Sequence, residues 1–406
     1  MFYNKSRTKG KARGGDGVDR DILHVDMNGF YASVEMLFHP EARQVPMAVG
    51  GDAQERHGII LAKNELAKQR GVKTAETIWQ AKKKCPELLL LPPHRQLYAE
   101  YSAKANAIYS RFTDQVEPAS IDESYLDVTG SHRLFGTNWQ IAQCIRQTVK
   151  EELGLTVSVG ISFCKVFAKM GSDMKKPDAV TELNRENWQD VLYPMPVETL
   201  LGVGAVTAAR LRGAGMRTIG DVAERSRQAL EALLGKHGHS LYEYVHGLEQ
   251  EPVRRMGDHE TPKSIGRGRT FRRDLVGEEE IRVEILALCE DVAARLRQKG
   301  LRCWGVQLTI KDPQFACIDR QTQLEQPADT TGELYQGAMD VFGRVWHLGK
   351  PIRMMTVTAI SLTQETRQLS LFDDGRGEKL ARSVDQIRQK FGDGAIRPAA
   401  LLGREE

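Results

Sequence analysis

Two adjacent carboxylates, Asp122 and Glu123, stand between two short segments of alternating apolar residues. Neighbouring side chains of a regular strand point to opposite faces, so this pair can serve one site only where the chain turns between two strands. Taken alone, an Asp–Glu pair is more often a solvated turn. A third acid, Asp26, ends the apolar segment 21–27, which predicts a short buried strand. A buried acid is costly unless it is paired or binds a cation, and three such oxygen ligands suit Mg²⁺.

The segments that must position these acids predict an α+β unit, because helical and strand periods alternate in them. The turn at Asn28 and Gly29 runs into a helix that ends near Leu37, and free backbone N–H groups at such a helix start can hold a phosphate. The other predicted elements of this unit are helices at 94–112 and 137–152 and a strand at 156–162, interrupted by a Lys-rich insert at about 38–93.

The second half of the chain predicts two further parts. Short helices are expected over 187–250, where Gly202 and Gly204 have the form of a helix-hairpin-helix whose glycines let backbone amides approach a DNA phosphate. After a polar linker at 251–259, the predicted order is β-α-β-β-α-β, the ferredoxin-like arrangement. Its elements are strand 264–271, helix 278–298, strands 301–311 and 315–323, helix 329–346 and strand 352–362.

The first strand of that ferredoxin-like part is strongly basic. Lys263–Arg273 carries five basic residues and no acid, although the whole chain has a formal net charge of only +3. Alternation along the strand puts Arg267 and Arg269 on one face, where they can straddle a phosphate backbone. Residues 1–20 likewise carry six Lys or Arg against two Asp. Local basic stretches beside a carboxylate centre suit a protein that holds a polyanion while it binds a metal.

Composition also limits where the protein works. The chain has 406 residues, enough for two to four domains. Its six cysteines include no Cys-x-x-Cys pair, which is typical of free thiols in a reducing cytosol. No segment approaches the roughly 18 apolar residues of a membrane span, and the basic N-terminus lacks the apolar core of a signal peptide. We therefore predict a cytoplasmic protein that has no contact with a membrane.

Together these motifs resemble a Y-family DNA polymerase, close to the bacterial DNA polymerase IV group, over residues 20–374. The resemblance implies a multidomain right-hand α+β fold and template-directed, low-fidelity translesion synthesis from dNTPs on primer-template DNA. The motifs are Asp26-Met27 with Phe30-Tyr31-Ala32, Ser120 to Asp127, Val159 to Ser162 with Lys165 to Lys169, Asp173 to Pro177, and Lys263 to Gly266. The implied parts are a basic tail at 1–19, a palm at 20–37 and 94–184, fingers at 38–93, a thumb at 185–250, a linker at 251–259, a little finger at 260–365 and a C-terminal tail at 366–406.

The resemblance also assigns roles to single residues. Asp26, Asp122 and Glu123, with the carbonyl of Met27, would hold two Mg²⁺ ions that activate the primer 3′-hydroxyl and neutralise charge on the phosphates. The amides of Gly29, Phe30 and Tyr31 would grip the dNTP β- and γ-phosphates, Tyr31 would be the steric gate against ribonucleotides, and Lys176 would neutralise triphosphate charge.

Four positions depart from the common pattern of the family. Ala62, Glu65 and Lys68 stand where many relatives carry Thr, Tyr and Arg to grasp the triphosphate. We expect Lys68 to keep that role and Glu65 to point away, because a carboxylate beside a triphosphate is repulsive. Asn28 replaces a second acid of many relatives, a change that we expect to be tolerated because that position is not a required metal ligand.

The C-terminal tail carries the clearest partner signal. The residues Gln368, Leu369, Leu371 and Phe372 lie in a segment that is similar to the peptide with which bacterial polymerases bind the sliding clamp. The resemblance implies a monomeric enzyme recruited by that clamp. Two other functions stay open: a non-catalytic DNA-binding scaffold that retains the polymerase fold, and a helix-hairpin-helix repair nuclease or glycosylase that would need no dNTPs.

Overall fold

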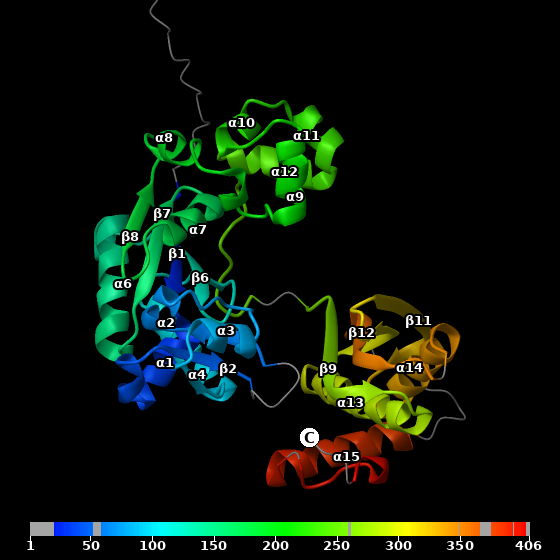
Figure 1. Cartoon of the computed structure of the whole chain (residues 1–406). Helices are drawn as coiled ribbons and strands as arrows, with labels where there is room; N and C mark the ends of the chain where they lie inside the picture. The colour runs from blue at the N-terminus through cyan, green and yellow to red at the C-terminus, as the bar shows by residue number, and fades with distance from the viewer. Residues whose placement is uncertain are drawn as a thin grey trace, which may run out of the picture. The chain divides into compact units, whose positions relative to one another are not determined.

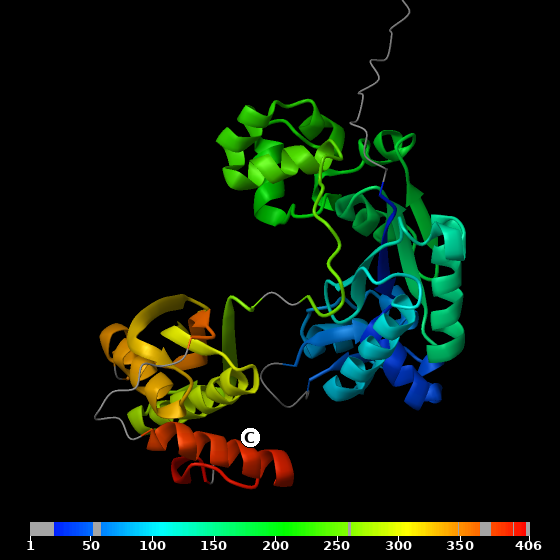
Figure 2. The same cartoon turned by 180° about the vertical axis from the view of Figure 1, so that it is seen from behind.

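The computed structural model describes residues 20–51, 58–258, 261–347, 349–365, 375–392 and 394–402. The chain forms two compact units, one that ends at Asp258 and one that follows it (Figures 1 and 2). None of the helices in these described ranges is long and apolar enough to cross a bilayer. Four of the six free cysteines are buried, as expected for thiols that fill cores.

The first unit is built on a five-stranded sheet of order β5-β6-β1-β7-β8. The helices α4 and α6 cover one face of this sheet and share a core with β1 and β7, while α7 covers the other face (Figure 1). The predicted strand at 22–27 and the helix that follows it are confirmed. The elements are β1 (Ile22–Met27), α4 (Arg95–Tyr109), β5 (Val116–Pro118), β6 (Glu123–Asp127), α5 (His132–Phe135), α6 (Asn138–Leu153), β7 (Val157–Ser162), α7 (Lys165–Met174) and β8 (Val180–Leu183).

Helix α7 approaches the sheet closely at one glycine. A Cβ added to Gly160 of β7 would lie 1.9 Å from the carbonyl oxygen of Ala168 and 2.4 Å from the amide nitrogen of Ser172. No side chain fits there, because real Cβ contacts of this kind are never so short. Because glycine has no side chain at this position, α7 can lie this close to the sheet.

A smaller sheet and one helix adjoin the large sheet. Its order is β3-β2-β4, with β4 parallel to β2 and β3 antiparallel to it. The helix α1 (Phe30–Phe38) packs between this small sheet and α4. The remaining elements of this part are η1 (Pro40–Arg43), β2 (Met47–Gly50), β3 (Ile60–Lys63), α2 (Glu65–Gln69), α3 (Ile78–Lys84) and β4 (Leu89–Leu91).

The short helices predicted over 187–250 are confirmed. Gly202 has φ 86° and Gly215 has φ 83°, left-handed values that only glycine adopts without strain, so both turns require glycine. His239 Nδ1 lies 2.8 Å from Glu231 Oε1 and its Nε2 lies 3.3 Å from Glu243 Oε1, so two glutamates fix this ring at the surface. The elements are α8 (Trp188–Leu192), η2 (Val197–Thr199), α9 (Ala205–Gly213), α10 (Ile219–Ala223), α11 (Arg227–Leu234) and α12 (Lys236–Val245).

The second unit has the predicted β-α-β-β-α-β order, with a four-stranded antiparallel sheet of order β11-β10-β12-β9. Two strands are longer than predicted, because each continues past a register shift to a last paired residue, Leu275 in one and Ala328 in the other. The elements are β9 (Ser264–Leu275), α13 (Glu278–Gln298), β10 (Arg302–Lys311), β11 (Cys317–Ala328), α14 (Thr331–Val345) and β12 (Ile352–Thr363).

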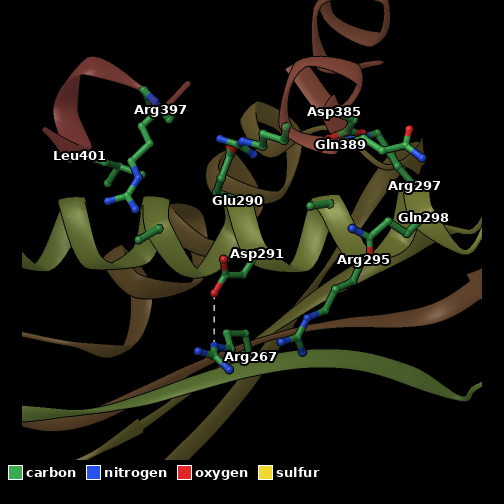
Figure 3. A pocket seen from close by; sticks show the side chains of 14 residues that line it. Arg267, Glu290, Asp291, Arg295, Arg297, Gln298, Asp385, Gln389, Arg397 and Leu401 are labelled. Carbon is green, nitrogen blue, oxygen red and sulfur yellow. Dashed lines mark hydrogen bonds and ion pairs between the residues drawn. The ribbon is translucent and has the colours of Figure 1, made fainter. Parts of the chain in front are cut away.

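The C-terminal segment is part of this second unit. Helix α15 (Arg376–Phe391) and the short η3 (Ala399–Leu401) lie against α13, around a cavity of about 940 Å³ (Figure 3). Two nitrogens of Arg297 donate to Asp385 at 2.6 and 2.9 Å, and Arg388 donates to Glu290 at 2.7 Å. The sequence predicted only a polar helix here, and these ion pairs explain how a helix with so little apolar surface is held.

We expect Gly160→Ala to destabilise the first unit, because the added methyl group must push α7 away from β7. Overpacking of this kind costs about 1–3 kcal/mol. Thermal unfolding would show this as a lowered Tm. The control is Gly213→Ala in α9, where a Cβ meets nothing within 4 Å. Equal Tm values for the two variants would contradict the close approach.

Candidate active site

The two strands β1 and β6 bring the predicted acids together. Asp26 and Glu123 are direct cross-strand partners in their antiparallel register. The amide of Met27 donates to the carbonyl oxygen of Asp122 at 3.0 Å. The strand β5 ends at Pro118, so the chain does turn just before this pair, as the sequence predicted. The site therefore lies where β1 leaves the sheet.

Two lysines hold these acids. The ammonium of Lys169, from α7, lies 2.8 Å from Glu123 Oε1 and 3.3 Å from Asp26 Oδ2. Lys176 donates to the same Asp26 oxygen at 2.8 Å and lies 2.8 Å from Asp173 Oδ1. The Asp26 side chain is only 8% exposed. The two ammonium groups thus provide the positive charge that such closely placed acids require.

The electrostatics of the site follow from burial and these pairs. Burial raises the pKa of Asp26, although the hydrogen bond from Lys176 opposes that shift. The pKa of Glu123 is lowered, because the His24 ring and the Lys169 ammonium both favour its charged form. Burial alone would lower the pKa of Lys169, but its bond to Glu123 and the nearby charge of Asp173 outweigh burial and raise it.

The third acid is placed differently. The Asp122 carboxylate accepts a hydrogen bond from Ser120 Oγ at 2.7 Å, and this residue is half-buried. In the ranges that the structure describes, no three His, Cys, Asp or Glu side chains are close enough to hold a metal ion. The charges of Asp26 and Asp122 are both felt by the phenol of the buried Tyr109, whose hydroxyl has no hydrogen-bond partner. Burial, and then these two charges, raise the pKa of Tyr109. Asp122 is therefore beside the pair but turned toward Ser120.

The donor set nevertheless fits a hard divalent cation. Asp26 and Glu123 supply carboxylate oxygens, the ligands that Mg²⁺ prefers. Their negative charge is matched here by Lys169 and Lys176, both of which reach Asp26 from outside β1 and β6. A cation bound between the two acids would supply the same compensation. The arrangement can hold a metal if these lysines shift to other anionic groups.

Sequence reasoning missed His24. Its side chain is fully buried, with Nδ1 at 2.8 Å from Ser172 Oγ and Nε2 at 3.6 Å from Glu123 Oε2. Burial lowers the pKa of this imidazole. The signal was present in the spacing, because residues two apart in a strand share a face and His24 precedes Asp26 by two.

The start of α1 offers a binding place for phosphate. Gly29 has φ 53°, a left-handed value, and caps α1 at its N-terminus with no side-chain hydrogen bond. The first amides of α1, from Phe30 and Tyr31, have no partner within the helix by its geometry. Asn28, the departure from the family pattern, donates to Ser158 Oγ at 2.9 Å and so ties the end of β1 to β7.

The ring of Tyr31 is fixed by a second tyrosine that the sequence did not reveal. Tyr31 and Tyr98 stack with ring centroids 4.1 Å apart and an interplanar angle of 14°. Tyr98 is fully buried, and its hydroxyl donates to the buried carboxylate of Glu35. Phe30 packs against both rings. Tyr31 therefore cannot rotate away without breaking this stack.

The remaining predicted dNTP and DNA contacts lie on other elements than the carboxylate site. Lys68 is paired with Glu65 at 2.9 Å, both side chains more than half exposed, and Ala62 lies in β3 opposite Val49. Gly204 begins α9, where a Cβ would meet nothing within 4 Å, and Gly202 forms the turn before it.

The basic residues of β9 face the helix beside them. Arg267 lies 3.2 Å from Asp291 and Arg269 lies 3.6 Å from Glu284, both acids of α13 (Figure 3 draws the first pair). Lys263 is exposed just before β9. The predicted clamp-binding residues, 368–372, lie outside the described residues.

The sequence matches known protein families over most of its length. The impB/mucB/samB family matches residues 25–173, its C-terminal domain matches 262–371, and the thumb domain of DNA polymerase-iota matches 198–249. DNA polymerase IV of Acetivibrio thermocellus is 44% identical over 94% of this chain and 98% of its own length. DNA polymerase IV 2 of Halalkalibacterium halodurans is 40% identical over 94% of this chain and 95% of its own.

A solved structure agrees with these relatives in fold. A Y-family DNA polymerase chimera matches with a TM-score of 0.74 at 23% identity, over 85% of this chain and all of that chain. The chain therefore belongs to the Y family of DNA polymerases, a family of metal-dependent nucleotidyltransferases. Within that family it is of the bacterial DNA polymerase IV type, a translesion DNA polymerase whose substrates are primer-template DNA and dNTPs. The scaffold, nuclease and glycosylase alternatives are not supported.

Proposed function

We propose that this polymerase performs low-fidelity nucleotidyl transfer with two Mg²⁺ ions at Asp26, Asp122, Glu123 and the carbonyl of Met27. The observation that carries the proposal is the cross-strand pairing of Asp26 with Glu123, joined to Asp122 through the hydrogen bond to the Met27 amide. These ligands would hold Mg²⁺, which would supply a lower pKa for the primer 3′-hydroxyl and positive charge beside the phosphates. The Asp122 carboxylate would exchange Ser120 for the metal.

The chain's own groups bind and orient the dNTP. The amides at the start of α1, from Gly29, Phe30 and Tyr31, would donate hydrogen bonds to the triphosphate. Lys176 is paired with Asp26 and Asp173. When the acids bind metal, its ammonium group would leave them and pair with the triphosphate. Lys68 would contribute once it leaves Glu65, an exposed pair whose separation costs little.

DNA would be held by the turns and strand that the sequence indicated. Gly202 and Gly204 open the backbone before α9 to a phosphate. Lys263, Arg267 and Arg269 would attract the duplex, and the two arginines would exchange their α13 acids for phosphates. We further propose that the enzyme is a cytoplasmic monomer recruited by the sliding clamp.

Asp122→Asn and Glu123→Gln should each abolish Mg²⁺-dependent primer extension, with a loss of at least about a hundredfold, because each change removes a charge that the metal needs. Both changes keep the shape of the side chain, so DNA binding should persist. Glu151→Gln, in the exposed part of α6, is the control and should extend primers normally. Retained extension by both site variants would refute the metal assignment.

Tyr31→Ala should admit ribonucleotides, because the ring that would collide with a 2′-hydroxyl is gone. We also expect a smaller rise in ribonucleotide use for Tyr98→Ala, which removes the stacked partner but leaves the gate itself. The measurement is the ratio of kcat/KM for dNTP and the matching rNTP. An unchanged ratio in Tyr31→Ala would remove this residue from the gate.

Deletion of 368–372 should abolish clamp binding and leave basal primer extension intact, because this segment resembles a docking peptide and includes none of the proposed metal or dNTP ligands. Surface plasmon resonance with immobilised bacterial clamp measures the first, and extension without clamp measures the second. Unaltered clamp affinity would show that the segment is not the docking peptide.

A further inference from the structure

Trp79 is exposed to an unusual degree for so large an apolar side chain. It is 71% exposed, whereas Trp188 and Trp346 are buried. Its helix α3 turns Ile78 and Ala81 into the small core of the β3-β2-β4 sheet. Trp79 therefore lies on the solvent side of α3, where packing within the first unit gives it no reason to be aromatic.

The surface around this ring is positive. The ammonium of Lys83 lies 5.5 Å from the centroid of the Trp79 ring, and Lys82 is exposed next to it. Of the described residues that flank α3 in sequence, the two acids are already engaged, because Glu76 is bound by Lys84 and Glu87 by Arg70. An aromatic face flanked by unneutralised lysines is the combination that binds single-stranded nucleic acid without sequence preference.

The helix α3 also belongs to the part of the first unit that contacts α1, whose N-terminus is the proposed place of the dNTP phosphates. It packs on the small sheet, which contacts α1 (Figure 1). The carbonyl oxygen of Lys63, at the end of β3, lies 3.4 Å from where a Cβ of Gly29 would be. The small sheet is therefore directly against the turn that begins α1.

We propose that Trp79, supported by Lys83, is a stacking platform for an unpaired base of the template strand. The proposal rests on the polymerase activity, since only a template that extends beyond the primer offers unpaired bases next to the site. Duplex DNA hides its base faces, and an apolar protein surface would have to strip water from the two lysines, so the charge favours single-stranded DNA. One base stacks on the ring while the lysines attract its phosphates.

Binding without turnover tests this proposal. Fluorescence anisotropy would compare primer-templates with a one-nucleotide overhang, a ten-nucleotide overhang and a ten-nucleotide abasic overhang that keeps the phosphates. Trp79→Ala should weaken binding of the normal long overhang about tenfold, as expected for the loss of one stacked base, and leave the short overhang within about twofold. Trp79→Phe should retain most of the affinity. In the wild-type protein, the abasic overhang should show the same loss as Trp79→Ala.

The matched control is Trp139→Ala, which removes a second exposed tryptophan, 42% exposed at the start of α6. It should leave all three affinities unchanged. Equal weakening of short and long overhangs by Trp79→Ala would overturn the proposal, as would abasic and normal overhangs that bind wild-type protein equally. Unchanged binding in Trp79→Ala would show that the ring serves another partner. None of these outcomes depends on catalysis, so they differ from a failure of the metal assignment.

Discussion

The bridge that Lys169 makes between Asp26 and Glu123 is the interaction on which the site depends. The carboxylates of Asp26 and Glu123 face each other at the end of two interior strands and repel, and Asp26 is nearly buried, so this pair requires a cation beside it. Lys169 comes from α7, the helix that packs on β7 and β1. Its reach is set by the contact at Gly160, where no side chain separates helix from sheet.

This dependence links backbone packing to chemistry. A slip of one residue between β1 and β6 would turn Asp26 toward the α4 and α6 core and leave Glu123 without its partner. The buried residues on either side of Asp26, Val25 and Met27, prevent such a slip because they fill that core. Under the proposed metal assignment, a bound cation would replace the charge of Lys169 and release the acids. The strands would then need no rearrangement, because Lys169 already holds the two acids together.

How much of this could be predicted from the sequence depends on how local each signal is. The strand ending in Asp26 and the β-α-β-β-α-β order are fixed by periodicity, and both were predicted correctly. The role of Lys169 was not, because a lysine in a helix shows nothing of the acid 46 residues away that it binds. Tyr98 was missed for the same reason, since its stacking on Tyr31 depends on how α4 packs against α1.

The arginines of β9 show a different limit. Alternation correctly put Arg267 and Arg269 on one face of β9. The two-residue period of a strand does not show, however, which face of the sheet the helices cover. Ile265 and Phe271 share that face and are buried against α13, so the arginines lie over the helix and meet its acids. Hydrophobic neighbours at the same parity were the available signal.

The C-terminal helix changes how the end of the chain should be understood. The sequence predicted a polar tail after the little finger, yet Arg297, Glu290 and Arg302 of the second unit each hold a charged residue of α15. Arg297 and Glu290 are largely buried, so separating them from Asp385 and Arg388 would leave charges in a poor environment. The chain therefore leaves the sheet at Thr363 and returns to the same unit at Arg376. The described C-terminal helix is thus a packed part of the second unit and not a free tail.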